Sequence, residues 1–130
     1  MNLEQEQGGL LNKMVLVDTG LTLIRDIVNT DLSSGQSGIS TYPADETQTG
    51  LLSAVATTLN TLESPKVNSG DTITVTHIVT TSEASGSRLS EWEVLGNTDA
   101  TNYNRIVLSP LQKDSNTQIN MIHAFIFTRI

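Results

Sequence analysis

The sequence contains no cysteine among its 130 residues, which excludes disulfide bonds, thiolate zinc sites and cysteine nucleophiles. Aromatic residues are scarce, and no apolar run approaches the roughly 20 residues that a membrane-spanning helix needs. The N-terminal stretch is acidic where a secretory signal would be basic, and Asn12 and Lys13 interrupt its apolar part. We therefore expect neither a membrane protein nor export by a signal peptide.

Basic residues are also few, and the formal net charge is −7. The lysines and arginines are scattered from Lys13 to Arg129 without forming a patch. Because this charge repels phosphate, we expect no direct binding of nucleic acid. Threonine, serine and asparagine are abundant, and threonine favours strands. The chain length fits one domain with a substantial core.

The order of segments predicts an N-terminal arm over residues 1–17 and a single domain over residues 18–130. A polar stretch with a glycine pair opens the arm, and Leu10 to Val17 is apolar, which fits either a short strand or the approach to a helix. The spacing of Leu21, Ile24 and Val28 then predicts an amphipathic helix over Thr19 to Asn29, packed against a sheet.

Two segments after the helix are harder to assign. Glycine and proline punctuate Thr30 to Asp45, which predicts a long loop with one short extended piece at Ile39 to Tyr42. Gly50 to Leu62 has an apolar stripe at helical spacing but is rich in β-branched residues. We favour a strand over Val55 to Leu62 and leave a helix open.

The segment Asp71 to Gly96 predicts a β-hairpin at the centre of the fold. Its first half alternates strictly, with one face formed by Ile73, Val75, His77 and Val79. Ser82 to Ser87 offers turn residues, and Arg88 to Leu95 is predicted to return beside the first strand.

Two more strands follow the hairpin. A short strand is predicted over Arg105 to Leu108, closed by Ser109 and Pro110, and a turn over Lys113 to Thr117. The final strand, Gln118 to Ile130, is apolar on both faces in its middle, which predicts an interior strand beside the hairpin, covered on both sides. Together these patterns predict a mainly β domain, an antiparallel β-sandwich with one N-terminal helix.

Each candidate site residue can be explained by a functional role or by an ordinary structural one. His77 and His123 lie on apolar strand faces and could form a metal or catalytic pair, but two ligands do not make a zinc site, so we favour core positions. Trp92 stands between Glu91 and Glu93, a combination found in glycosidase and sugar-binding clefts. We favour Trp92 in the core with both glutamates solvated on the opposite face.

No other motif carries chemistry. Calcium-loop spacing is absent around the acidic residues Asp18, Asp26, Asp45 and Glu46. There is also no nucleophile elbow, phosphate-binding loop or dinucleotide fingerprint. We expect no enzyme, no cofactor and no metal site.

Short motifs resemble a loose group of small virion proteins encoded by tailed phages and archaeal tailed viruses. The matching stretches are Thr19 to Asp26, Ala44 to Thr47 with Leu51, Val67 and Gly70 with Thr72 to Val75, Leu89 to Leu95, Arg105 to Pro110 and Gln118 to Ile130. The resemblance implies a jelly-roll-like sandwich, repeated in a symmetric virion as a tail or capsid-decorating protein. Its implied partners are further copies of itself and other virion proteins.

Two rival functions stay open from the sequence. One is a carbohydrate- or receptor-binding module in which exposed aromatic rings, Tyr42 or Tyr103, stack on a ligand. The other is an enzyme that uses Glu91 and Glu93.

Overall fold

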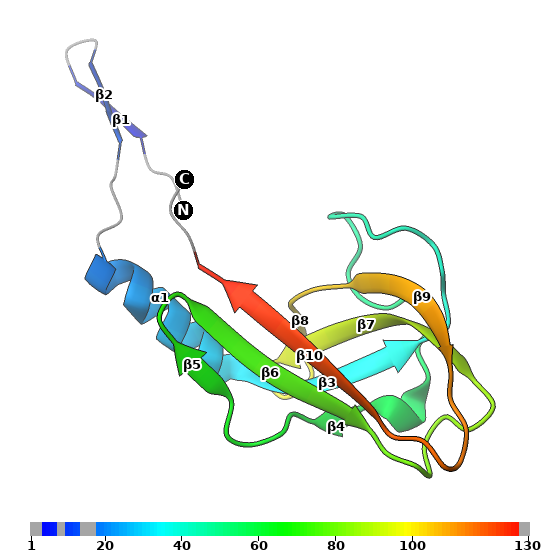
Figure 1. Ribbon diagram of the computed structural model, residues 1–130. Coiled ribbons are helices and arrows are strands. Elements are labelled where there is room, and N and C mark those ends of the chain that lie inside the picture. Colours follow the sequence, from blue (N-terminus) through cyan, green and yellow to red (C-terminus); the bar gives the residue numbers. More distant parts are fainter. Residues whose placement is uncertain (1–3, 8–9, 14–17, 128–130) are drawn as a thin grey trace.

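Two antiparallel sheets stack on each other and one helix lies beside them in the computed structural model, which describes residues 4–7, 10–13 and 18–127 (Figure 1). One sheet has the order β10-β6-β5 and comprises β5 (Val67–Ser69), β6 (Thr72–Val79) and β10 (Ile119–Ile126). The second sheet has the order β4-β3-β7-β8, and β9 also pairs with β7. Its strands are β3 (Leu32–Gly38), β4 (Asn60–Thr61), β7 (Arg88–Gly96), β8 (Thr101–Asn102) and β9 (Ile106–Gln112). The predicted antiparallel β-sandwich with one N-terminal helix is confirmed.

The first two strands form a separate hairpin. β1 (Glu4–Gln7) pairs antiparallel with β2 (Leu10–Lys13), and Figure 1 shows this hairpin apart from the two stacked sheets. Of the two alternatives for Leu10 to Val17, the short strand is present as β2. The rest of the predicted arm lies outside the described residues, and the boundary at residue 17 stays a prediction.

The predicted helix is present as α1 (Asp18–Asp31). Val28 packs against the core between the sheets, as the spacing predicts, but Ile24 on the same predicted face is 39% exposed. No residue of α1 is fully buried, and Leu23 and Ile27 are exposed. The helix therefore covers one margin of the sandwich with only part of its apolar surface.

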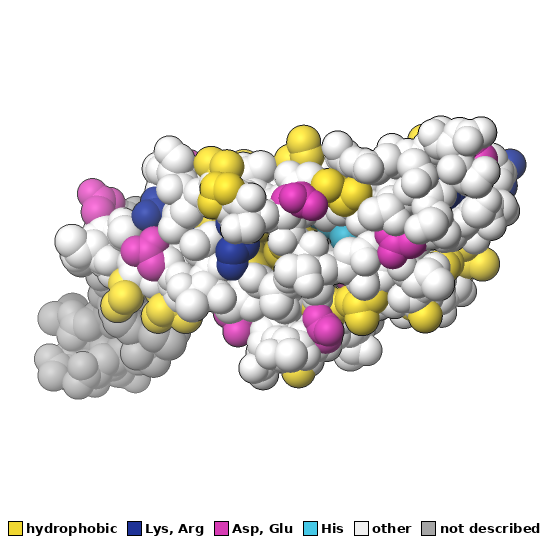
Figure 2. All heavy atoms as spheres, turned by 90° about the horizontal axis from the view of Figure 1, so that it is seen from below, with side chains coloured by type: hydrophobic (Ala, Val, Ile, Leu, Met, Phe, Trp, Pro, Cys, Tyr) yellow, Lys and Arg dark blue, Asp and Glu magenta, His cyan; other side chains and the backbone are white. Residues whose placement is uncertain are grey.

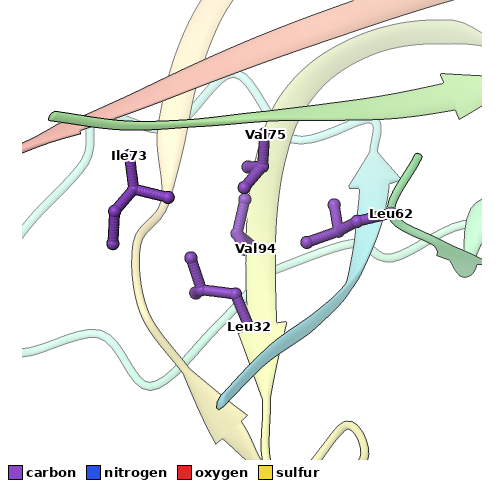
Figure 3. Packing of buried hydrophobic residues seen from close by; sticks show 5 residues of the cluster. All are labelled: Leu32, Leu62, Ile73, Val75 and Val94. Carbon is purple, nitrogen blue, oxygen red and sulfur yellow. The ribbon is translucent and has the colours of Figure 1, made fainter. Parts of the chain in front are cut away.

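The core lies between the facing surfaces of β6, β7 and β3. Ile73, Val75, His77 and Val79 are buried, which confirms the predicted alternation along β6. Figure 3 shows the side chains of one cluster pointing toward one another, namely Leu32, Leu62, Ile73, Val75 and Val94. A second cluster contains Val79, Leu89 and Trp92, so Trp92 is a core residue as predicted.

The predicted hairpin of Asp71 to Gly96 is wrong. β6 pairs along its whole length with β10, whereas β7 pairs with β3 and lies in the other sheet. Both strands point large apolar side chains at the core, so they face each other across the sandwich instead of lying side by side. The final strand, predicted to lie beside this hairpin in one sheet, pairs among the described strands with its first strand, β6, only.

The predicted burial of the final strand on both faces is also wrong. β10 is an edge strand, and its side chains alternate between the core and solvent. Ile122 and Ile126 point outward and are each 63% exposed. The apolar character of these outward residues led to the prediction of an interior strand, although only one face of β10 is covered.

The loop predicted over Thr30 to Asp45 contains the central strand β3. Its sequence, LSSGQSG, has the composition of a turn, yet β3 pairs with both β4 and β7. The small residues are required because the sheets approach closely: a Cβ on Gly35 would lie 2.5 Å from Cγ of His77. Ser37 donates from Oγ to the Glu91 carbonyl at 2.9 Å, so its hydroxyl is satisfied in the core.

Two element predictions need smaller corrections. The strand favoured over Val55 to Leu62 is a 3₁₀ turn, η1 (Ala56–Thr58), followed by the two-residue β4. The strand after Arg105 is longer than predicted, because β9 continues through Pro110 to Gln112. Pro110 is tolerated there because β9 is an edge strand whose register with β7 is broken between Leu89 and Glu91.

The two histidines are buried, as the core interpretation expects. The His77 ring donates from Nε2 to the Thr58 carbonyl at 2.7 Å, and the Asn104 amide lies 3.2 Å from Nδ1 of His123. Burial lowers the pKa of His77, and burial together with the nearby His77 lowers the pKa of His123 to about 4. Both rings are therefore neutral in the folded protein at neutral pH.

We expect acid to destabilise the fold through His123. The unfolded chain binds a proton near the ordinary pKa of 6.5 and the folded chain only near 4, so stability falls as the pH drops between these values. At about pH 5 the loss is on the order of 2 kcal/mol. Urea unfolding at neutral pH and at pH ~5 should show that His123→Gln removes about this much of the pH dependence. The other titrating groups, including His77, are shared by both proteins, and an unchanged pH dependence in the variant would contradict the assignment.

Candidate functional site

Glu91 is the centre of the most extensive polar cluster in the described part of the chain. Its carboxylate is fully buried and accepts four hydrogen bonds. Oε1 accepts from the Leu52 amide and from Nε of Arg105, both at 2.9 Å. Oε2 accepts from the amides of Ser53 at 2.8 Å and Ser40 at 3.1 Å. The predicted solvated position of Glu91 is wrong.

The reason is the path of the chain between β3 and β4. This segment returns over the second face of β7 and directs backbone N–H groups at the carboxylate. Burial alone would raise the pKa of Glu91, but the Leu52, Ser40 and Ser53 amides and the Arg105 guanidinium together hold it below its ordinary value. Glu91 is therefore ionised and fixes the segment to the sheet.

Arg105 extends the cluster to the tip of the same segment. Its Nη1 donates to the Tyr42 carbonyl and to Oε1 of Gln48, both at 3.0 Å. The Arg105 side chain is only 4% exposed, and its Nη2 makes no hydrogen bond. One guanidinium thus links Glu91 to the loop and retains an unused donor group.

The loop that Arg105 contacts, residues 42–48, is also stabilised by hydrogen bonds between its own residues. Gln48 donates from Nε2 to the Pro43 carbonyl and accepts from the Asp45 amide. Asp45 accepts from the amide and the hydroxyl of Thr47, both at 2.8 Å, and these bonds hold the Asp45 pKa below its ordinary value. The carboxylate of Asp45 is therefore charged and held in place.

A polar cavity of about 520 Å³ lies between residues 44–50 and residues 102–105. Both Asp45 and Glu46 line it, whereas Asp18 and Asp26 lie in α1. No group of three potential ligands among the described histidines and carboxylates could hold a metal ion. The cavity therefore joins acidic side chains with Arg105 without forming a metal centre within the described residues.

Glu93 is hydrogen-bonded to Asn102, one of the residues that line this cavity. It is buried, which again contradicts the predicted solvated position, and it accepts from Nδ2 of Asn102 at 2.9 Å. Burial raises the pKa of Glu93, with a further contribution from the charge of Glu91, against the hydrogen bonds from Asn102 and the Leu51 amide. The Glu93 carboxyl group therefore has a structural role, because it holds the Asn102 side chain in place.

The two tyrosines proposed from sequence as ligand platforms differ in their surroundings. Tyr42 is 68% exposed and lies next to the cavity-lining loop in the chain. The hydroxyl of Tyr103 donates to Asp31 at 2.6 Å and its ring packs edge-on against Phe125. Burial and the Asp31 carboxylate raise the pKa of Tyr103 to about 12. Only Tyr42 presents a broad exposed ring.

Sequence reasoning missed the burial of both glutamates and the role of Arg105. One signal was present in β7, where the apolar residues Leu89, Trp92, Val94 and Leu95 occupy both odd and even positions. That pattern is typical of a strand covered on both faces. It indicates that Glu91 and Glu93 cannot both face open solvent.

The free edge of β10 is a second candidate for function. In the described part of the chain, no strand pairs with the side of β10 that faces away from β6. The strand is eight residues long, pairs with β6 without a register shift and carries no charged residue. The other outer strands of the two stacked sheets are two or three residues long or, in β9, contain a proline and a register shift. Figure 2, seen from below relative to Figure 1, shows hydrophobic side chains in separate groups among polar ones.

Comparison of the chain with protein-family models, curated proteins and solved structures found no match. No helix within the described residues has the length and apolar character to cross a membrane.

Proposed function

We propose that this chain is a structural subunit of a tailed-virus particle, acting in the virion by self-association and by docking to other tail or capsid proteins. The observation that carries the proposal is the outer edge of β10, with which no described strand pairs. An unpaired strand presents a row of N–H and C=O groups that can pair with another chain. Proteins that stay monomeric protect such edges with lysine, proline, bulges or short strands, and β10 has none of these features.

The charge distribution supports pairing at β10. Two copies of a chain with a net charge of −7 repel each other over most of their surfaces. Ile119–Ile126 is uncharged, and Ala124 lies between the exposed isoleucines 122 and 126 on its outer face. Antiparallel pairing of β10 with its copy would join two three-stranded sheets and bring these apolar side chains together.

We expect the purified chain to self-associate in a manner that depends on β10. Ile122→Lys places a charge where the second strand would pack, and it should weaken association by about tenfold or more. Size-exclusion chromatography with light scattering over a concentration series measures this change. Leu108→Lys, on the proline-containing β9, is the matched control and should leave association unchanged. A wild-type chain that stays monomeric throughout the series would contradict the proposal.

The virion part of the proposal has its own test. Mass spectrometry of purified particles should detect this chain in a stoichiometric ratio to the other structural proteins. Its absence from particles, with self-association intact, would limit the proposal to an oligomeric protein outside virions.

The proposal assigns no catalytic role to Glu91 and Glu93. Both carboxyl groups are buried and hydrogen-bonded to other parts of the chain. Of the alternatives, a carbohydrate- or receptor-binding module is favoured by a specific feature, the polar cavity between residues 44–50 and residues 102–105, which Tyr103 helps to line.

A further inference from the structure

We propose that two copies joined at β10 bind a second such pair through the outer face of their β10-β6-β5 sheets, which gives a tetramer. This inference rests on the proposed function, because it takes the β10 edge as the contact within each pair. The strand register places alternate residues on the outer face, namely Val67 and Ser69 of β5, Thr72, Thr74, Thr76 and Ile78 of β6, and Asn120, Ile122, Ala124 and Ile126 of β10.

The outer face is uncharged and exposes apolar side chains. None of its three strands contains an aspartate, glutamate, lysine or arginine. Their two histidines, His77 and His123, are buried on the core side. Val67 is 57% exposed, and Ile122 and Ile126 are each 63% exposed, so no described segment covers these side chains. Apolar side chains that gather on one exposed face are typical of an interaction site.

The charge of the chain favours a copy of the same face as the partner. Two copies with a net charge of −7 repel each other, but contact between outer faces sets no charged strand residues opposite one another. Threonine hydroxyls both donate and accept, so such a face can form hydrogen bonds with its copy. Glu63 lies beside the sheet at the margin away from β10, because its amide donates to the Thr76 carbonyl at 2.9 Å. Its side chain is exposed, so water screens its charge at the rim of the contact.

The size of the outer face indicates that pairs associate, whereas single copies do not. β6 and β10 have eight residues each and β5 has three. With a rise of about 3.4 Å per residue and strands about 4.8 Å apart, the face covers about 300 Å² in projection. Contact between two single copies would bury roughly 600 Å² in total, well below the roughly 1,200–2,000 Å² of a specific interface. Contact between two β10-joined pairs doubles this area to about 1,200 Å², which reaches that range.

Pairing at β10 also places the apolar residues at the middle of the enlarged face. Ile122, Ala124 and Ile126 of both copies would form its centre, and the threonines of β6 would flank them on each side. An apolar centre within a polar rim is the usual arrangement of a protein interface. Stacked sheets pack about 10 Å apart, so the side chains of the two pairs can interdigitate.

Light scattering coupled to size-exclusion chromatography, over a concentration series of the full chain, tests the inference. The wild type should form dimers at low concentration and tetramers at high concentration. Thr74→Lys places a charge in the middle of the outer face, on the interior strand β6, and leaves the β10 edge unchanged. It should weaken tetramer formation by about tenfold or more while the dimer persists. Thr101→Lys, at an exposed position of β8 in the other sheet, is the matched control and should assemble as the wild type does.

The outcomes separate this inference from the proposed function. A wild type that stops at the dimer would overturn the inference and leave self-association through β10 intact, whereas a monomeric wild type would contradict both. Tetramers that form equally well in Thr74→Lys would also overturn it, since another surface would then join the pairs. Two-dimensional NMR spectra confirm that each variant is folded. Should Thr74→Lys not fold, Val67→Lys, at an exposed position of β5 on the same face, replaces it in the comparison.

Discussion

Replacing Glu91 with alanine is expected to lower the free energy of unfolding by about 3–5 kcal/mol. The change leaves the buried guanidinium of Arg105 without its ion-pair partner. It also removes the acceptor for the amides of Ser40, Leu52 and Ser53, which hold the chain between β3 and β4 against β7. A buried donor left without a partner costs about 1–3 kcal/mol, and this cost is part of the expected total.

Chemical denaturation with urea measures the effect of Glu91→Ala at neutral pH. Glu63→Ala, at an exposed position, is the control and should change stability by less than about 0.5 kcal/mol. A loss below about 1 kcal/mol for Glu91→Ala would show that the carboxylate does not organise the loop. Hydrogen exchange at residues 40, 52 and 53 should also accelerate in the variant, because their amides lose their acceptor.

The double variant Glu91→Leu with Arg105→Leu separates charge pairing from packing. Removing both charges eliminates the uncompensated guanidinium, so the double variant should be more stable than Glu91→Leu alone. The three backbone amides stay without an acceptor in both proteins. Equal stability of the two would indicate that Arg105 is not the main source of the loss.

Gly35→Ala is the second change for which we expect a large effect, about 2–3 kcal/mol. A Cβ at this position of β3 would lie 2.5 Å from Cγ of His77, inside the closely packed core. Gly70→Ala is the comparison, because that glycine has a left-handed φ of 62° but open space around it. Its cost is backbone strain alone, roughly 1–2 kcal/mol.

A double-mutant cycle with His77→Ala identifies the contact responsible. The added methyl group should cost less in the His77→Ala background, by more than about 0.5 kcal/mol, because the ring that it meets is gone. Gly70→Ala should cost the same in both backgrounds. A Gly35→Ala protein as stable as the wild type would mean that the two sheets do not approach as closely as described.

The sequence identified those elements whose pattern is local. The alternation along β6 follows from one buried face, and the predicted helix is present as α1 although none of its residues is fully buried. The positions of His77, His123 and Trp92 in the core followed from the same reasoning.

The elements that were missed depend on contacts between distant segments. β3 has the composition of a turn because its glycines and serines allow close approach of the other sheet, a requirement that appears only when His77 is opposite Gly35. Glu91 looks like a surface residue until residues 40, 52 and 53 and Arg105 surround it. The prediction of a β6–β7 hairpin was wrong for a related reason. A turn sequence between two strands does not show whether the second strand joins the same sheet or the facing one.

Disulfide cross-linking of single-cysteine variants tests most directly whether β10 pairs with its copy. The chain has no cysteine, so each variant forms only the cross-link that its own position allows. Ile122→Cys, Ala124→Cys and Ile126→Cys place a thiol at successive outward positions of β10, and Leu108→Cys places one on β9. We predict that mild oxidation gives a covalent dimer for at least one of the three β10 variants and none for Leu108→Cys. Equal cross-linking at both strands, or none at β10, would contradict self-association through this edge.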